Sequence, residues 1–239
     1  MTNVIYTAIS RQNGLTKELT TIANNIANAD TIGFRSDRPF YSEYVRVLSS
    51  GDQSLSQTRI AGRVLDFSNG AITKTGAQLD VAIEGEGFFV IDTPQGERLS
   101  RAGSFSLNAQ GGLTTQSGHS VLDQSGAPIT IPTDAANLII ADDGAIAADG
   151  LPVGQLAVAT APATALIREG DNLLRSTAAI TPVTAPKLRQ GFVEESNVNS
   201  VMEITRLIEV QRAFELNQQI IADEHERVSR AIDAFGNDG

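Results

Sequence analysis

Residues 5–26 read IYTAISRQNGLTKELTTIANNI, and one face of this segment follows alternating steps of three and four residues. Seven positions make up that face: Ile5, Ala8, Gln12, Leu15, Leu19, Ile22 and Ile26. All but Gln12 are apolar, which is typical of the narrow seam of a coiled coil rather than the wider stripe of a surface helix. Turn-forming residues at 28–33 predict that the helix ends there. A helix with such a seam needs a partner to bury it.

The other end of the chain carries a matching pattern. Apolar residues recur every seven positions at Leu207, Phe214, Ile221, Val228 and Phe235. A second column, apolar at only two of its five positions, consists of Ile204, Gln211, Gln218, His225 and Ile232. We expect the first column to pack against a helix and the second to meet a wetter or different interface. The nearest candidate partner for each terminal helix is the opposite end of the same chain, followed by copies from other molecules.

Between the two ends the apolar period changes to two, starting at Leu79. Short apolar runs such as Phe88–Ile91 alternate with turn signals such as Pro94-Gln95-Gly96, which predicts an antiparallel sheet or small barrel rather than βαβ units. The predicted fold class is α+β, with paired N- and C-terminal helices in a coiled coil plus a central antiparallel β-rich domain. The predicted parts are a discontinuous helical domain at 1–34 and 196–239, an extended connector at 35–78 and a β-rich outer domain at 79–195.

Composition limits the possible functions. A net charge of −10 argues against a nucleic-acid partner, because phosphate binding needs clustered Lys and Arg. No stretch approaches 18 consecutive apolar residues, so we expect no membrane span. The first ten residues contain no Lys or Arg and no apolar core, so we expect no cleaved secretory signal. The chain has no cysteine, which leaves the redox compartment open.

Candidate catalytic and metal-binding groups are few. His119 lies near Ser117, Ser120 and Asp123, but these are ordinary turn residues without a nucleophile elbow. Gly85 and Gly87 precede an apolar run rather than a helix, so they predict a turn instead of a dinucleotide loop. The tract 142–149 lacks the ligand pattern of a calcium loop, and His225 is expected to be solvated or to lie between helices. We therefore predict no catalytic residue, no metal site and no cofactor.

An enzyme is nevertheless the main alternative of a different class, for example a hydrolase acting on peptidoglycan. Such an enzyme needs two carboxylates about 5–10 Å apart in a cleft. Glu84 and Glu86 are the candidates, because they flank a glycine in one predicted turn.

Amide side chains are concentrated near the helix ends and on the last helix. They are Asn24, Asn25, Asn28, Asn197, Asn199, Asn217, Gln218 and Gln219. Asn is unfavourable inside a helix, so these amides need an explanation. One interpretation is a solvated face together with a helix stop. The other is a set of hydrogen bonds to neighbouring helices that fix their register, as a polar residue does in a coiled-coil seam.

Four stretches of the chain carry recognisable motifs, and together they cover almost its whole length. Residues 19–34 read LTTIANNIANADTIGF, and residues 196–221 read SNVNSVMEITRLIEVQRAFELNQQII. The first resembles the signature A-x-N-N-L-A-N-x-x-T-x-G-F of flagellar rod and hook proteins, and the second is similar to that family's S-N-V-N-x-V-x-E-x-x-x-x-I-x-x-Q-R-x-Y-E, in the same order. Residues 69–91 and 101–122 are similar to the family's central strands and turns. Phe214 stands where Tyr is usual, and Arg35 stands where Lys is common.

The resemblance implies a structural subunit of the flagellar basal body that transmits torque from the motor to the hook and filament. Length and residues 3–8 are most similar to a proximal rod member, and a distal rod member is the nearest alternative. The family's inner tube pairs the terminal helices and its outer domain is β-rich. The implied partners are other rod proteins, further copies of the chain in a helical array, and the flagellar type III export apparatus, with export that cleaves no signal peptide.

Two groups of site residues follow. From the heptad pattern we expect subunit contacts and the helix seam at Ile5, Leu15, Leu19, Ile22, Ile26, Leu207, Phe214, Ile221 and Val228. The resemblance implies that the family motif is carried by Asn24, Asn25, Asn28, Gly33, Phe34, Asn197, Asn199, Gln211 and Arg212. For Arg212 two interpretations stay open, a contact within or between subunits and a solvated ion pair with Glu209 or Glu215.

Overall fold

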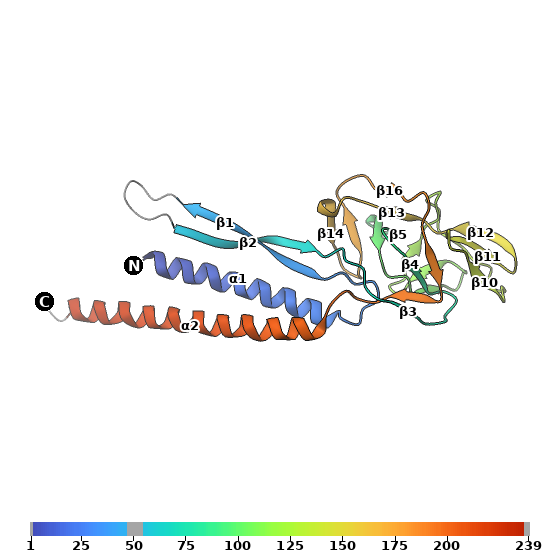
Figure 1. Ribbon diagram of the computed structural model, residues 1–239. Helices are drawn as coiled ribbons and strands as arrows, with labels where there is room; N and C mark the ends of the chain where they lie inside the picture. The colour runs from blue at the N-terminus through green and yellow to red at the C-terminus, as the bar shows by residue number, and fades with distance from the viewer. Residues whose placement is uncertain (1, 47–54, 237–239) are drawn as a thin grey trace. The chain divides into compact units, whose positions relative to one another are not determined.

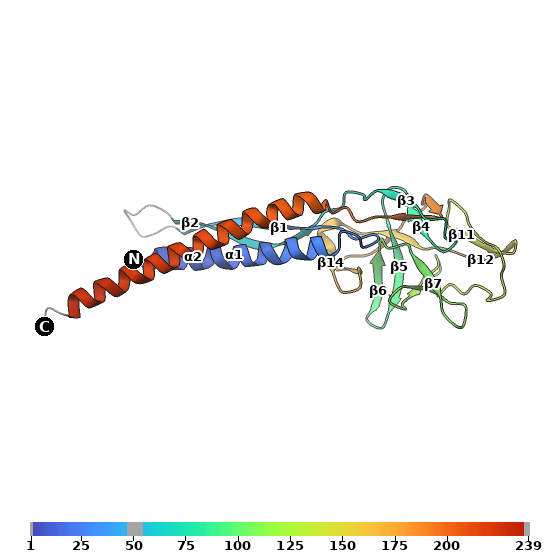
Figure 2. The same ribbon diagram turned by 90° about the horizontal axis from the view of Figure 1, so that it is seen from below.

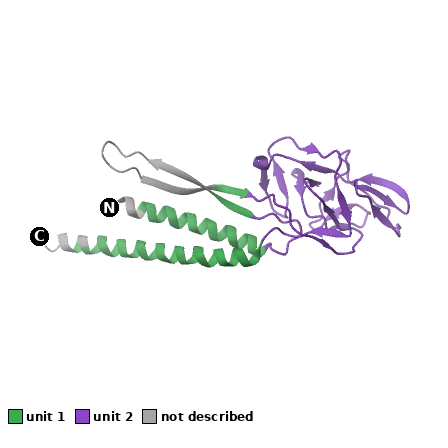
Figure 3. Cartoon of the chain, in the orientation of Figure 1, with its two compact units in different colours: residues 1–27, 37–64, 199–239 green, residues 28–36, 65–198 purple. Residues whose placement is uncertain are grey.

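The computed structural model describes the backbone of residues 2–46 and 55–236, and the side chains of residues 6–40, 62–230 and 233. Two views of the chain are given in Figure 1 and Figure 2. The chain divides into two compact units, coloured in Figure 3. Unit 1 comprises Met1–Ala27, Asp37–Val64 and Asn199–Gly239, and unit 2 comprises Asn28–Ser36 and Leu65–Val198.

Unit 1 contains two long helices and a two-stranded sheet. Helix α1 (Thr2–Ala27) and helix α2 (Ser200–Gly236) lie side by side, and strands β1 (Asp37–Arg46) and β2 (Leu55–Leu65) pair with each other (Figure 1). Asn199 caps α2, since its side-chain oxygen accepts a hydrogen bond of 3.1 Å from the backbone N–H of Met202. The predicted end of the first helix, at residues 28–33, agrees with the end of α1 at Ala27.

Unit 2 consists of short strands joined by turns, and every strand pairing recorded in it is antiparallel. Its strands are β3 (Ile72–Lys74), β4 (Val81–Ile83), β5 (Phe88–Thr93), β6 (Gly96–Ser100), β7 (Phe105–Leu107), β8 (Leu113–Thr115), β9 (Ser120–Val121), β10 (Leu138–Ile140), β11 (Ala145–Ala148), β12 (Leu151–Gln155), β13 (Val158–Thr160), β14 (Leu166–Arg168), β15 (Leu174–Ser176), β16 (Thr181–Pro182), β17 (Leu188–Gln190) and β18 (Phe192–Glu194). A 3₁₀ turn, η1 (Ala163–Ala165), precedes β14.

The largest sheet has nine strands and runs in the order β14-β15-β6-β5-β9-β8-β7, with β13 and β16 attached beside β5. A three-stranded sheet, β10-β11-β12, and the pairs β4–β17 and β3–β18 complete the unit. The last two pairs join strands from opposite ends of the unit's sequence. The fold of unit 2 is therefore complete only when the strands near residue 190 pair with the strands near residue 75.

Strand β5 forms the centre of the core because both of its faces are apolar. Phe89 and Ile91 face one hydrophobic cluster, while Phe88 and Val90 face another on the opposite side of the sheet. The uninterrupted apolar run that precedes Asp92 is the pattern of a strand covered on both faces. The Phe89 ring meets that of Phe105 edge to face, with centroids 5.1 Å apart.

The prediction of an α+β fold with two terminal helices and a β-rich centre is confirmed. Residues 37–64, which lie within the stretch predicted as a connector at 35–78, group with the helices in unit 1. Asn25 of α1 explains part of this grouping. Its amide accepts a 2.9 Å hydrogen bond from the Asp37 N–H and donates one of 2.9 Å to the Asp37 carbonyl, which holds the start of β1 against α1. Backbone contacts of this kind leave no periodic signal in a sequence.

The Phe89→Ala substitution tests the central place of β5. Removing a fully buried ring typically costs about 3–5 kcal/mol, so we expect a loss of that size in the free energy of unfolding. Urea unfolding followed by amide exchange in β5 and β6 measures it. The matched control is Ile139→Ala on β10, where the side chain is 51% exposed and the expected change is within about 0.5 kcal/mol. Equal effects of the two substitutions would contradict this description of the core.

Candidate functional site

A buried carboxylate, that of Glu194 at the end of β18, is the centre of the motif region in unit 2. Its Oε1 forms an ion pair with Arg35 Nη2 at 2.9 Å and accepts a hydrogen bond of 2.9 Å from the backbone N–H of Gly70. Its Oε2 accepts one from Arg101 Nε. The side chains of Glu194 and Arg101 are each 2% exposed. The carboxylate is thus shared by two arginines and a backbone N–H, away from water.

Arg101 also binds the glycine turn that links β4 to β5. Its Nη2 donates to the carbonyls of Ile83, at 2.9 Å, and of Gly85, at 2.6 Å. Its Nη1 donates to the carbonyl of Gly87. The two glycines therefore shape a turn around a guanidinium, in agreement with the prediction that they do not form a dinucleotide-binding loop.

The charges in this cluster depend on one another. Burial lowers the pKa of the Arg35 guanidinium, Glu194 opposes that change, and the neighbouring charge of Arg101 adds to it. Two buried cations therefore rely on one carboxylate. Removing one partner of a buried ion pair is expensive, because the charge left behind has neither water nor a counter-ion.

Gly33 and Phe34 of the motif lie against this cluster. The backbone N–H of Gly33 donates a 2.7 Å hydrogen bond to the carbonyl of Glu194. Gly33 has a φ of +67°, and a Cβ at this position would overlap the backbone of Arg101 and Ala102. Only glycine satisfies both conditions. The ring of Phe34 is buried, and the Arg168 guanidinium stacks 4.3 Å from its centroid.

Asn197 holds three backbone segments of unit 2 together. Its Oδ1 accepts a 2.7 Å hydrogen bond from the N–H of Ser36, and its Nδ2 donates to the carbonyls of Asp66, at 3.0 Å, and Ser68, at 2.9 Å. Near the end of α1, the Asn28 carbonyl accepts a 3.2 Å hydrogen bond from the Thr31 N–H. The side-chain Oδ1 of Asn28 accepts a further hydrogen bond of 3.2 Å from the Thr31 hydroxyl, so the amides of Asn197 and Asn28 both have structural partners. Asn24 is exposed.

The seam residues predicted on α1 and α2 belong to unit 1. On α1, Ile22 is buried, Leu15, Leu19 and Ile26 are half-buried, and the side chain of Ile5 lies outside those described. On α2 the predicted column is half-buried at all four described positions, Leu207, Phe214, Ile221 and Val228. The side chains of Phe235 and Ile232 also lie outside the described part. Gln211 and Arg212 are exposed.

The most buried column of α2 lies beside the predicted one and includes Val210 and Asn217. In the second predicted column, the side chains of Ile204, Gln218 and His225 are exposed and lie on another face of α2. A polar side chain, that of Asn217, therefore lies among the most buried positions of α2, beside the predicted column.

Polar contacts between described side chains also join α1 and α2. Asn217 Nδ2 donates a 2.9 Å hydrogen bond to the carbonyl of Ala8, and Arg206 Nη2 lies 2.8 Å from Glu18 Oε1. Asn25 Nδ2 lies 3.4 Å from Glu203 Oε2. The sequence had indicated Asn25 and Asn217 as amides in need of partners. It gave no sign of the Glu18–Arg206 pair, because single charges beside an apolar stripe usually belong to a solvated face.

A further apolar face of α2 is exposed within unit 1. Its large side chains are Val201, Met202, Ile204, Ile208, Leu216 and Ile220. On α1, Tyr6 and Ile9 are likewise exposed. Exposed large apolar side chains gathered on one helix, such as Ile204 and Ile208, point to a surface for interaction.

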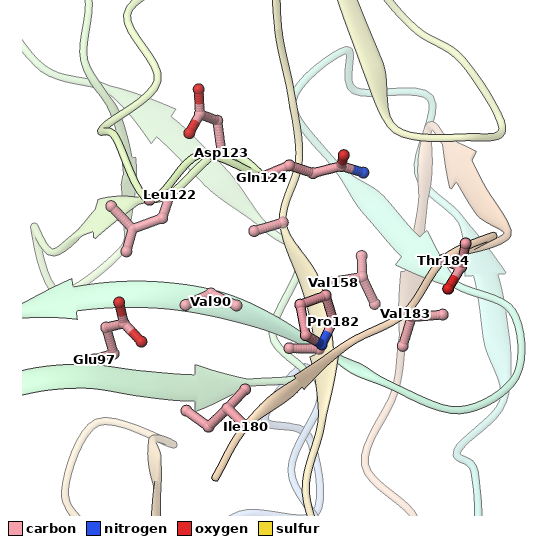
Figure 4. Close-up of a pocket in the computed structure, with 13 residues that line it drawn as sticks. Val90, Glu97, Leu122, Asp123, Gln124, Val158, Ile180, Pro182, Val183 and Thr184 are labelled. Atoms are coloured by element: carbon pink, nitrogen blue, oxygen red, sulfur yellow. The ribbon is translucent and has the colours of Figure 1, made fainter.

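The structure gives the enzymatic alternative little support. A cavity of about 420 Å³ in unit 2 is lined by apolar side chains including Val90, Leu122 and Ile180, with Glu97 and Asp123 as its carboxylates (Figure 4). The hydrogen bond from the Ser125 hydroxyl, followed by that from the Ala127 N–H, lowers the pKa of Asp123. A general acid in glycoside hydrolysis needs a raised pKa instead.

The remaining candidates from the sequence are placed as follows. Glu84 and Glu86 are exposed around the glycine turn. His119 lies in the turn between β8 and β9, and its Nε2 is 3.9 Å from Asp171 Oδ2. Among the described residues, no group of three or more His, Asp or Glu could hold a metal ion. Within the same part of the chain, no helix has both the length and the apolar character to cross a membrane.

Three known protein families match the two ends and the centre of the chain. Residues 5–35 match the flagella basal body rod protein family, residues 82–148 the flagellar hook protein FlgE/F/G D1 domain, and residues 189–234 the flagellar basal body rod FlgEFG protein C-terminal family. The flagellar basal-body rod protein FlgF of Caulobacter vibrioides is 37% identical over 99% of both chains. The chain belongs to the flagellar basal-body rod protein family.

Other rod proteins show the same relation over nearly the whole chain. FlgF of Mesorhizobium japonicum is 36% identical over 99% of both chains, and FlgG of Bacillus subtilis is 33% identical over 97% of this chain and 98% of its own. The prediction of a structural rod protein of the flagellar basal body is confirmed. The relatives are named as rod proteins and not as enzymes, which agrees with the prediction that the chain is not an enzyme. A FlgF-like rod protein is favoured over a FlgG-like one.

The Glu194→Gln substitution tests the buried cluster of this rod protein. An amide cannot neutralise Arg35 and Arg101, so we expect unfolding of unit 2 to become easier by about 3–5 kcal/mol. Urea unfolding followed by amide exchange in β3 and β18 measures this loss. Glu195→Gln is the matched control, because Glu195 is the exposed neighbour and should change stability by less than about 0.5 kcal/mol. An equally stable Glu194→Gln protein would refute the role given to the carboxylate.

Gly33→Ala and Gly76→Ala separate backbone strain from close packing in unit 2. Both glycines have positive φ, +67° and +77°, but a Cβ at Gly76 meets nothing within 4 Å. Gly76→Ala should therefore cost only the left-handed strain of about 1–2 kcal/mol. Gly33→Ala adds an overlap with backbone atoms and should cost clearly more. Thermal unfolding of the two variants compares them, and similar losses would show that the contact with Arg101 and Ala102 is unimportant.

Proposed function

We propose that the chain is a subunit of the proximal rod, in which α1 and α2 form a coiled coil and stack against helices of neighbouring subunits. In this proposal the coiled coil occupies the inner part of the rod, built from residues 1–34 and 196–239. Residues 79–195 form a β-rich outer domain, and residues 35–78 connect the two. The rod transmits torque from the motor to the hook and filament.

The observation that carries the proposal is that α2 has two apolar faces. One face, which includes Val210 and the column at Leu207 and Phe214, turns toward α1. The other includes Ile204 at 47% exposed and Ile208 at 45% exposed. Burying one such side chain contributes about 1.5–3 kcal/mol, so a neighbouring helix that covers the second face would gain a substantial stabilisation.

The predicted seam residues receive their roles within this arrangement. Leu15, Leu19, Ile22 and Ile26 pack on the α2 column Leu207, Phe214, Ile221 and Val228, and Ile5 extends the same stripe toward the start of α1. Gln211 and Arg212 are exposed on α2 and are proposed to contact other subunits. Arg212 is well suited to such a contact, because a guanidinium makes several directed hydrogen bonds at an interface.

The proposed partners are other proximal and distal rod proteins together with further copies of this chain in a helical array. A proximal position is supported by the FlgF proteins, which match at 36–37% identity over 99% of this chain. A distal position, as for FlgG, is the alternative. The proposed location is the periplasmic rod.

Export is proposed to pass through the flagellar type III apparatus as an unfolded chain, without a cleaved signal peptide. The composition supports this route, because a chain without cysteine has no disulfide that must be avoided or broken during passage. Strands β17 and β18, near the end of the unit 2 sequence, pair with β4 and β3 near its start. Unit 2 can therefore be completed only when both parts of the chain are present, which suits a domain that folds after export.

Ile208→Asp tests whether the second face of α2 docks other subunits. A carboxylate there stays solvated in the free chain but would be buried without a partner at a helix interface. We expect the variant to fold with unchanged helix content and to fail in rod assembly, which removes motility when it replaces the parent protein in cells. Gln218→Asp, at an exposed polar position of α2, should assemble normally. Full motility with Ile208→Asp would contradict the proposed interface.

A further inference from the structure

We propose that Asn217 is the residue that sets the axial register of α1 against α2. Its side chain is only 3% exposed, and its Nδ2 donates a 2.9 Å hydrogen bond to the carbonyl of Ala8. An amide at the most buried described position of α2 gains less from burial than leucine would. It does, however, impose a condition that an apolar side chain does not, because it requires a hydrogen-bond partner.

The apolar stripe by itself does not choose one register. The column Leu207, Phe214, Ile221 and Val228 repeats every seven residues, so a shift of one heptad would again place apolar side chains against apolar side chains. Such a shift corresponds to about 10 Å along the helix axis. The sequence therefore needs a second, non-repeating signal to distinguish the observed register from its neighbours.

Asn217 provides that signal because its partner is a backbone atom under a small side chain. Ala8 is 8% exposed, and its methyl group leaves the carbonyl within reach of the amide. A shift by one heptad would bring Asn217 opposite Leu15, whose larger side chain would separate the amide from the backbone of α1. Asn217 would then be buried without its hydrogen bond, at a cost of about 1–3 kcal/mol.

Two further polar contacts support the same register. Glu18, 8% exposed, accepts hydrogen bonds from Arg206 Nε at 3.1 Å and Nη2 at 2.8 Å. The Asn25 amide lies 3.4 Å from Glu203 Oε2. From Ala8 to Asn25 the contacts advance along α1 while they move back along α2, so all three belong to one antiparallel alignment. A shift in either direction would break them together.

The chain offers a direct measurement because it has no cysteine of its own. Spin labels at Thr20→Cys and Gln219→Cys, both exposed, report the axial separation of the helices by double electron–electron resonance on the purified full chain. The labels are offset along the axis, so a slip of one heptad shifts their distance by about 10 Å and a slip of one turn by about 5 Å. The measured distance reports the alignment of α1 with α2 and does not depend on rod assembly.

The parent protein should give one dominant distance. Asn217→Leu should add a second population shifted by about 5–10 Å, because leucine is accepted equally well in the shifted registers. The matched control is Gln218→Leu at the exposed neighbouring position, which should keep a single distance. Adding Glu18→Leu to Asn217→Leu should enlarge the shifted population.

Several outcomes would overturn the inference. One is a single, unchanged distance in Asn217→Leu. Another is loss of helical circular dichroism in that variant, which would mean that the amide holds the pair together instead of selecting its register. A parent protein without a dominant distance, or a Gln218→Leu protein that shifts as much as Asn217→Leu, would overturn it as well.

Discussion

The Glu194 carboxylate is the interaction on which unit 2 depends. It is shared by Arg35 and Arg101, it accepts from the backbone of Gly70, and the carbonyl of the same residue receives the N–H of Gly33. Each of these groups comes from a different part of the sequence. A buried cluster of this kind is favourable only when every member is present, since an incomplete set leaves a charge without water or a partner. The motif glycines and Asn197 surround this cluster and give it a defined shape.

Unit 1 is organised on a different principle. Burial of apolar side chains holds its two helices together, whereas a few polar side chains determine how the helices are aligned. Stability and alignment therefore depend on different residues. Leu207, Phe214 and Ile22 provide apolar area, while Asn217 and Glu18 accept only particular partners. The second apolar face of α2 adds no constraint within the chain. It gives the same helix a role toward other molecules, as expected for a family that builds a rod.

Patterns local in sequence predicted much of this structure. The 3–4 spacing together with the turn residues at 28–33 predicted the first helix and its end, and short apolar runs such as Phe88–Ile91 predicted strands of an antiparallel sheet. The apolar heptad on α2 did not indicate that Asn217, beside the predicted column, is the most buried described residue of that helix. The Glu194 cluster could not be predicted, because it joins residues 35, 101 and 194 and charged residues are normally exposed. Its one sequence signal was the resemblance of the flanking motifs to a known family.

The division of the chain has a mechanical consequence. The polypeptide passes between the two units four times, at residues 27–28, 36–37, 64–65 and 198–199. In unit 2, Asn197 fastens three of these passages by binding the backbone of Ser36 and Asp66 close to where they leave. A pull exerted on one unit therefore reaches the other through four covalent tethers acting in parallel. A single linker would bear the whole load, whereas four covalent connections divide it among them.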